Sequence, residues 1–198
     1  MIGRLRKYAT DIGGYACNLV IEADFSGLRP FAPLPGIEIR QFGSDNWALL
    51  GDLVCRRVAP VFTAAARAGR SCLVAWRGSR ALGYIWLSPA AELRHENFAL
   101  PLPPDANYLW QLQVARSQRR QGVCAALVSA GLQWSMEQGF RRSRMITRND
   151  NVAAQRTIAS LAPCLVLGKV RRVKVGPWMR SRYLPLAAPR PLHPRVTA

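Results

Sequence analysis

The clearest pattern of apolar and polar positions lies between residues 108 and 134, YLWQLQVARSQRRQGVCAALVSAGLQW. At its start, Trp110, Leu112 and Val114 alternate with two glutamines, which predicts a strand with one apolar and one polar face. Residues 115–121 are polar and rich in arginine, and they predict a turn. Beyond the turn, apolar side chains recur at helical spacing: Val123, Leu127, Ala130 and Trp134. The segment therefore predicts a strand, a basic turn and a helix.

Further periodic segments lie on both sides of this one. They predict a strand at 37–42, helices at 47–54 (with Asp45 as a possible N-cap) and 58–68, a hairpin at 71–87, a strand around 144–146, a helix after Asp150 or Asn151, and two strands between residues 164 and 186. Residues 90–107 are polar and contain three prolines, which predicts a loop of a length that is usually functional or mobile.

Glycine and proline residues mark the ends of this series. Residues 1–36 carry Gly13, Gly14 and Gly27 and end in a proline-rich stretch, so they predict an N-terminal extension. Its apolar run at 19–21 could form a strand or a helix that docks on the domain or covers a sheet edge. Residues 37–186 form the predicted domain, and the proline-rich residues 187–198 predict a disordered tail.

The junction at Gly122 has the properties of a phosphate site. The first N–H groups of a helix have no intrahelical partner, and the aligned peptide dipoles place partial positive charge there. Glycine has no Cβ, so its backbone lets an anion approach closely. Many phosphate sites share this arrangement, and an ordinary strand–loop–helix with solvated arginines is the alternative.

The spacing within the loop is more specific. The residues Arg119-Arg120-Gln121-Gly122-Val123-Cys124 resemble the acyl-CoA loop of the GCN5-related N-acetyltransferase (GNAT) superfamily, whose pattern is Gln or Arg, two residues, Gly, one residue, then Gly or Ala. Val114 precedes the loop by five residues, as the family's hydrophobic strand residue does. Cys124 departs from the pattern, but cysteine is small and packs like a short apolar side chain.

The resemblance implies a fold, a donor and a reaction. The fold is α/β (α+β), a single domain with a mixed central sheet of about six to seven strands flanked by helices, splayed between strands four and five. The donor is acetyl-CoA or another acyl-CoA, which a primary amine attacks directly in a ternary complex. The residues implied in coenzyme binding are Leu112, Gln113, Val114, Arg119, Arg120, Gln121, Gly122, Val123, Cys124 and Asn151. Asn151 could equally be a plain helix N-cap.

The catalytic groups are less clear. Amide N–H groups near 112–114 would stabilise the developing oxyanion, and a base or a water chain must take the proton of the amine. Glu96 and His95 are the base candidates, and the alternative is that both are only exposed loop residues. The family often places a tyrosine seven residues after Asn151, where it protonates the departing thiolate. Ile158 stands there instead, so a hydroxyl elsewhere, such as Ser160 or Tyr183, or water would serve.

Charge and composition restrict the partners. The net charge is +17, and residues 99–198 hold 16 basic residues against three acidic ones. Such a field favours an anionic partner: coenzyme phosphates, an acidic acyl carrier protein that could replace CoA as donor, nucleic acid, or an anionic membrane surface. No nucleic-acid-binding motif occurs, so nucleic acid is not the expected partner, although a non-catalytic CoA-binding or nucleic-acid-binding domain stays an alternative.

Other features of the composition exclude further classes. No apolar run is long enough to span a membrane, and the N-terminus lacks the features of a secretory signal. The five cysteines are scattered without a CxxC pair, which predicts reduced thiols in a cytoplasmic protein and no metal site. The acceptor is expected to be a small-molecule or peptide amine. The sequence leaves its identity, the acyl chain length and the oligomeric state open.

Overall fold

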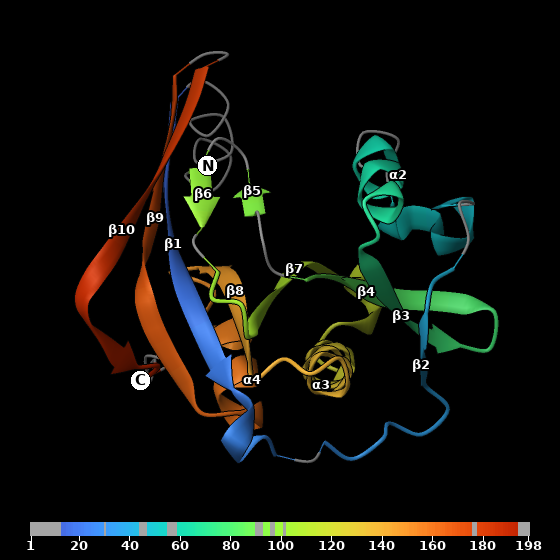
Figure 1. Ribbon diagram of the computed structural model, residues 1–198. Coiled ribbons are helices and arrows are strands. Elements are labelled where there is room, and N and C mark those ends of the chain that lie inside the picture. Colours follow the sequence, from blue (N-terminus) through green and yellow to red (C-terminus); the bar gives the residue numbers. More distant parts are fainter. Residues whose placement is uncertain are drawn as a thin grey trace, which may run out of the picture.

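The computed structural model describes residues 13–29, 31–43, 47–54, 59–89, 93–95, 98–100, 102–175 and 178–193. Eight strands form one sheet in the order β10-β9-β1-β8-β7-β4-β3-β2 (Figure 1). These strands are β1 (Gly13–Asp24), β2 (Glu38–Gln41), β3 (Ser71–Arg77), β4 (Arg80–Ser88), β7 (Ala106–Val114), β8 (Arg142–Arg148), β9 (Cys164–Val175) and β10 (Trp178–Pro191). A separate pair, β5 (Leu93–His95) and β6 (Phe98–Leu100), lies within the segment predicted to be a loop.

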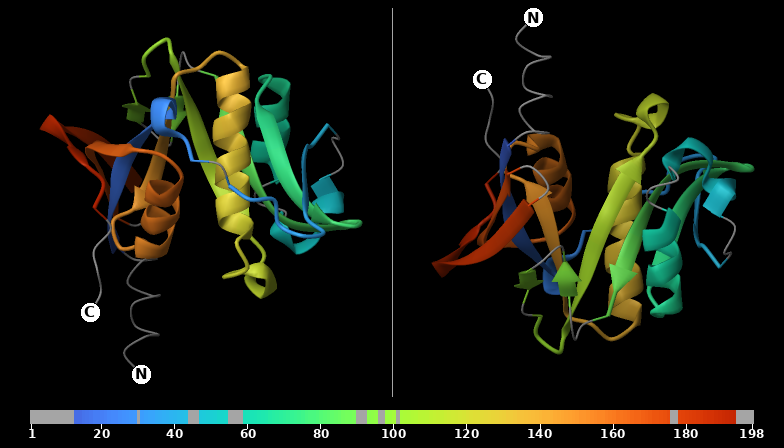
Figure 2. Two further views of the ribbon diagram at one scale, coloured as in Figure 1. Left: turned by 90° about the horizontal axis from the view of Figure 1, so that it is seen from below. Right: turned by 90° about the horizontal axis from the view of Figure 1, so that it is seen from above.

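Helices lie on both faces of the sheet. The α-helices are α2 (Ala59–Arg67), α3 (Val123–Glu137) and α4 (Val152–Leu161), and the 3-10 helices are η1 (Phe25–Gly27), η2 (Trp47–Leu53) and η3 (Arg116–Gln118). Helices α3 and α4 cover one face, and α2 and η2 lie against the other (Figure 2). The predicted helix at 47–54 is therefore a 3-10 helix, which is interrupted where Gly51 adopts a φ of 54°.

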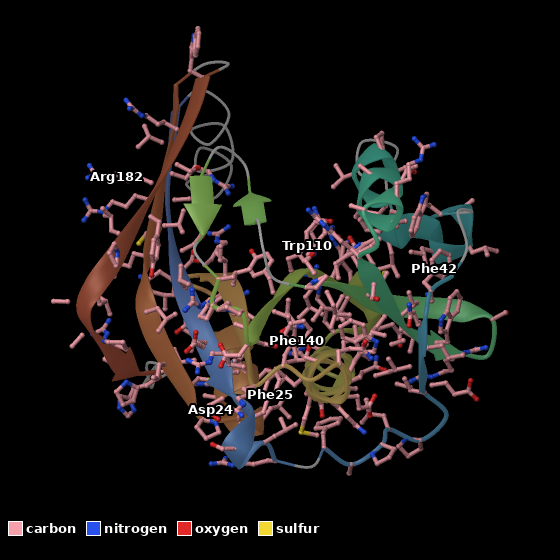
Figure 3. All side chains as sticks on the ribbon, in the orientation of Figure 1. Asp24, Phe25, Phe42, Trp110, Phe140 and Arg182 are labelled. Carbon is pink, nitrogen blue, oxygen red and sulfur yellow. The ribbon has the colours of Figure 1, made fainter. Side chains whose placement is uncertain are left out.

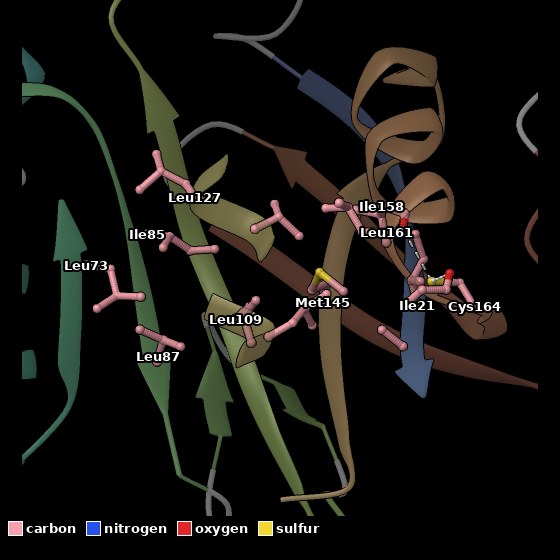
Figure 4. Packing of buried hydrophobic residues seen from close by; sticks show 14 of the residues in the cluster. Ile21, Leu73, Ile85, Leu87, Leu109, Leu127, Met145, Ile158, Leu161 and Cys164 are labelled. Atoms are coloured by element: carbon pink, nitrogen blue, oxygen red, sulfur yellow. Dashed lines mark hydrogen bonds between the residues drawn. The ribbon is translucent and has the colours of Figure 1, made fainter. Parts of the chain in front are cut away.

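Each face has its own hydrophobic core. On the α3 face, Ile85, Leu109 and Leu127 pack together with residues of β8 and α4 (Figure 4). On the α2 face, Trp47 and Phe62 pack edge to face with ring centroids 5.2 Å apart, and both rings contact Trp86 of the sheet. The sheet therefore lies between two layers of helices, with one hydrophobic core on each face.

The first strand corrects the prediction that residues 1–36 are an accessory extension. β1 lies inside the sheet, antiparallel to β8 on one side and to β9 on the other. Its side chains Val20 and Ile21 are fully buried, one in each core. The apolar run at 19–21 therefore forms an interior strand rather than the cover of an edge. The domain boundary predicted at residue 37 does not separate this strand from the sheet.

The last strand corrects the prediction of a disordered tail from residue 187. β10 continues to Pro191, with Arg190 opposite Val166 after an irregularity in the register. The Leu192 amide donates a hydrogen bond to the Cys164 carbonyl at 2.9 Å, and the Leu192 side chain is buried. Residues 194–198 lie outside the described part of the chain.

The predicted splay is present between β7 and β8, the fourth and fifth strands after residue 37 apart from the short β5–β6 pair. The two strands run parallel and pair only from Ala106 opposite Arg142 to Leu109 opposite Met145. Beyond that point they diverge, although β7 continues to Val114 and β8 to Arg148. The α/β (α+β) class and the mixed, splayed sheet are confirmed. The sheet has eight strands rather than six or seven because β1 joins it.

Candidate active site

A cleft of about 1450 Å³ opens where β7 and β8 separate. Its walls come from the end of β7, the basic loop, the N-termini of α3 and α4, η2 and the start of β4. All but two of the predicted coenzyme-binding residues line it, namely Leu112, Gln113, Val114, Arg119, Arg120, Gly122, Cys124 and Asn151. Of the other two, Val123 is buried in the core and Gln121 is exposed, with its Nε2 donating to the Ser117 carbonyl at 3.0 Å. Their roles in binding stay predictions.

A β-bulge shapes the floor of the cleft. Trp86 pairs with Trp110, but Tyr84 pairs with Gln113, so β7 has one residue more than β4 across this interval. The extra residue is Gln111, whose φ of 46° is left-handed, a conformation that is strained for a residue with a Cβ. The prediction of a single apolar face is therefore wrong. Trp110 packs in the core on the α2 face, whereas Leu112 and Val114 pack on the α3 face.

The bulge also gives Gln113 a defined partner. Because Gln113 lies opposite Tyr84, their side chains share the α2 face, and the Tyr84 hydroxyl donates to Gln113 Oε1 at 3.2 Å. The Tyr84 side chain is almost fully buried, so it anchors the amide of Gln113 at the cleft wall. The Gln113 amide nitrogen remains a donor that can orient a substrate or a water molecule.

The basic loop turns sharply before α3. Arg120 and Gly122 both have left-handed backbones, with φ of 62° and 79°. Gly122 is the N-cap of α3 but has no side chain to bond the first amides, so those amides remain available to a ligand. A Cβ at Gly122 would lie 3.2 Å from both methyl carbons of Leu34. Two features of the fold therefore favour glycine here: the left-handed backbone and the short distance to Leu34. Close approach of an anion would be a third reason.

Hydrogen bonds hold this loop to the sheet. Arg119 Nε donates to the Val114 carbonyl at 3.4 Å, and Arg77 Nη1 donates to Gln118 Oε1 at 3.4 Å. The side chain of Gln118 is buried although the rest of η3 is exposed. The helix N-terminus and the arginines around it form a positive site at which an anionic group can bind.

The N-terminus of α4 forms the opposite wall. Asn151 is its N-cap, and Asn151 Oδ1 accepts a hydrogen bond from the Ala154 amide at 3.2 Å, which confirms the capping interpretation. Asn151 is also exposed and lines the cleft, so its Nδ2 group can still donate to a ligand. Ala154 and Thr157 follow on the same helix face and line the cleft as well.

Ile158, which stands where the family often has a tyrosine, does not face the cleft. Ile158 is 5% exposed and packs in the core on the α3 face (Figure 4). The hydroxyl that α4 does present to the cleft belongs to Thr157. Sequence reasoning missed Thr157, although its spacing of three from Ala154 places the two residues on the same face of the helix. Ser160 does not line the cleft, and its hydroxyl donates to the Thr157 carbonyl at 2.8 Å.

The base candidates receive no support from the described residues. Glu96 lies outside them, and His95 is the last residue of β5 with its side chain undescribed. Tyr183 donates to the Leu167 carbonyl at 3.4 Å, and burial raises its pKa. Along the described part of the cleft there is no Asp, Glu or His.

The remaining lining residues were not predicted because they belong to no motif. Arg80 and Arg116 add positive charge beside the loop, and apolar residues of η2 close the cleft on the α2 face: Leu49, Leu50, Gly51 and Leu53. The Cys124 thiol also lines the cleft, and burial raises its pKa, so it is mainly protonated at neutral pH. Within the described ranges no group of three or more His, Cys, Asp and Glu residues could hold a metal ion. None of the described helices is long and apolar enough to cross a membrane.

The mixed sheet splays between β7 and β8, and a basic, glycine-containing loop precedes α3, as the sequence resemblance implied. The model of the acetyltransferase (GNAT) family matches residues 45–161, and the chain belongs to this family. A search of curated proteins found no match.

Solved structures are similar to this chain at low sequence identity. A Drosophila protein has a TM-score of 0.60 and 13% identity over 88% of this chain and 57% of its own. The GCN5-related glucosamine N-acetyltransferase region of a fungal multi-domain β-N-acetylglucosaminidase has a TM-score of 0.57 and 10% identity, over 86% of this chain and 22% of its own. The aminoglycoside N-acetyltransferase AAC(6')-Iy, in complex with CoA, has a TM-score of 0.49 and 21% identity, over 63% of this chain and 90% of its own. The chain thus spans just over half of the Drosophila protein.

Proposed function

We propose that the protein is an N-acyltransferase that moves an acyl group, with acetyl the expected one, from CoA to a primary amine by direct attack. The observation that carries the proposal is the cleft itself. It joins the part of β7 that does not pair with β8 to the N-termini of α3 and α4, so one ligand can contact all three. The family membership of the chain supports an acyl-CoA donor.

Each wall of the cleft suits one part of the donor. The α3 N-terminus and Arg119 would hold the pyrophosphate. The backbone of β7 beyond Leu109, which does not pair with β8, would bond the pantetheine arm, and Asn151 Nδ2 could donate to the same arm. Amides near the bulge would stabilise the negative charge that develops on the carbonyl oxygen.

Proton transfer would then use water and the hydroxyls at hand. The Tyr84–Gln113 pair could orient a water molecule that takes the proton of the amine, and Thr157 could donate to the departing thiolate. The thiol of a model cysteine has a pKa of about 8.5. The CoA sulfur can therefore also leave as an unprotonated thiolate near neutral pH. We further propose a cytoplasmic location, which suits the free described cysteines.

The test is a combined binding and turnover experiment. CoA or acetyl-CoA at 100 times its Kd should stabilise the protein by about 2.7 kcal/mol in a thermal-shift assay. Release of free thiol from acetyl-CoA and longer acyl-CoAs should appear with at least one member of a panel of small-molecule and peptide amines. The absence of any stabilisation by CoA would refute the proposal. Binding of CoA with persistent silence across the panel would favour a non-catalytic CoA-binding domain.

A carrier-protein donor is the second candidate. The mouth of the cleft carries Arg80, Arg116, Arg119 and Arg120 with no described carboxylate among its lining residues, a surface that would attract an acidic acyl carrier protein. Donor preference separates the two candidates. If turnover with an acyl carrier protein exceeds that with free acyl-CoA at equal concentration, the second is correct.

A further inference from the structure

The hairpin of β9 and β10 forms a projecting arm at one side of the sheet. We use the name arm for residues Val170–Val175 of β9 and Trp178–Tyr183 of β10, which pair antiparallel and are joined in sequence by Gly176 and Pro177. In Figure 1 the arm reaches beyond the other described elements; β1 follows it along its inner edge, and β6 contacts β10. Trp178, near the end of the arm, is exposed and can approach a large partner.

One face of the arm carries unneutralised positive charge. Arg171 lies directly opposite Arg182, and Arg180 lies opposite Val173 in the next row, so all three guanidinium groups share a face. All three are exposed, and none makes an ion pair with a described carboxylate (Figure 3 shows Arg182 projecting from the arm). Like charges directly opposite each other destabilise a sheet. An anion bound between the two guanidinium groups would lower this cost.

Apolar side chains lie next to these charges. Trp178 is 80% exposed, the largest value among the exposed large hydrophobic residues, and Val173 is 46% exposed. In sequence, the five residues at the tip, VGPWM (175–179), are all uncharged. Basic residues flank them on both sides: Arg171, Arg172, Lys174, Arg180 and Arg182. Among its described side chains, the arm thus combines the exposed Trp178 and Val173 with the exposed Arg171, Arg180 and Arg182.

From this combination we infer that the arm docks the protein on an anionic lipid bilayer. Tryptophan favours the interface between headgroups and hydrocarbon, where its ring is apolar and its N–H can still be hydrated. Basic residues near an anionic leaflet each add a favourable electrostatic contribution that is screened by salt. The headgroup phosphates also neutralise the Arg171–Arg182 pair.

A bilayer suits the arm better than a nucleic acid does. A nucleic acid would neutralise the arginines and could stack one base on Trp178. It would leave Val173 in water, whereas a bilayer removes Val173 from water together with the indole. The inference is independent of the acyltransferase activity, because none of these residues lines the cleft.

Vesicle sedimentation with the full-length protein tests the inference. We expect binding to vesicles that contain about one third phosphatidylglycerol in phosphatidylcholine, much weaker binding to pure phosphatidylcholine, and a marked loss of binding in 0.5 M salt. Trp178→Ala should lower the partition coefficient about tenfold, and the double variant Arg171→Gln/Arg182→Gln should do the same. Arg190→Gln, an exposed charge elsewhere on β10, and Met136→Ala, an exposed apolar residue on α3, are matched controls that should bind like wild type.

Fluorescence gives an independent signal from the tip. The other five tryptophans are buried or half-buried, so Trp178 dominates the exposed emission, and it should shift to shorter wavelength on anionic vesicles. The inference is overturned if the arm variants bind anionic vesicles as wild type does. It is also overturned if the wild-type protein binds no vesicles. If it then binds a single-stranded oligonucleotide and the arm variants do not, the partner is a nucleic acid instead.

Discussion

Two glycines with the same left-handed backbone conformation flank helix α3, and they offer a controlled test of the proposed coenzyme loop. Gly122 caps its N-terminus with φ 79°, and Gly139 follows its C-terminus with φ 84°. An alanine in the left-handed region costs about 1–2 kcal/mol. Gly122→Ala and Gly139→Ala should therefore each lower Tm by roughly 2–8 °C, since 1 kcal/mol corresponds to about 2–4 °C at this chain length.

The two variants should differ in their affinity for CoA. A Cβ at Gly139 meets no atom within 4 Å, so that variant changes only local stability. A Cβ at Gly122 meets Leu34 at 3.2 Å and favours rotation of the backbone out of the left-handed region. That rotation would turn the first amides of α3 away from a bound phosphate. We expect CoA binding to weaken at least tenfold, about 1.4 kcal/mol, and more strongly for the β-branched Gly122→Val.

Isothermal titration of CoA, carried out well below the Tm of each variant, separates affinity from stability. The expected result is that Gly139→Ala binds as wild type does and Gly122→Ala does not. Arg119→Ala should have a smaller and salt-sensitive effect, because the backbone amides do much of the holding. If folded Gly122→Ala and Gly122→Val proteins both bind CoA with the affinity of wild type, the loop is not the pyrophosphate site.

Three further outcomes are expected. Deletion of residues 194–198 should leave Tm unchanged, whereas deletion of 187–198 removes the buried Leu192 and should lower Tm by several degrees in a thermal melt; equal melts would show that the end of β10 adds nothing. Ile158→Tyr should destabilise the protein by about 1–3 kcal/mol through overpacking with little gain in turnover, whereas Thr157→Ala should leave stability nearly unchanged and lower kcat severalfold if its hydroxyl acts on the thiolate. Because burial raises the pKa of the Cys124 thiol, Cys124 should react slowly with an alkylating reagent at pH 7 and faster as the pH rises. Saturating CoA should protect Cys124 from alkylation, as measured by mass spectrometry. Unchanged labelling would place CoA elsewhere.

Local patterns in the sequence determined most of the secondary structure and the centre of the site. The strand–loop–helix around Gly122, the hairpin of β3 and β4, the helix from Val123 and the N-cap Asn151 all depend on contacts within a few residues. Such elements are readable from spacing because apolar periodicity and capping act locally. The family pattern of the loop then placed most of the predicted coenzyme-binding residues on one cleft.

Only the tertiary structure decided which strands became neighbours and which faces the side chains took. A short apolar run such as 19–21 can cover an edge or fill a sheet. This run lies inside the sheet because β1 pairs with β8 along one edge and with β9 along the other. The bulge at Gln111 reverses the faces of Leu112 and Val114, since one added residue shifts a period of two. Likewise Thr157 rather than Ile158 faces the cleft because α4 turns its apolar stripe, including Ile158, into the core. These outcomes depend on pairing and packing between distant segments, which local periodicity does not record.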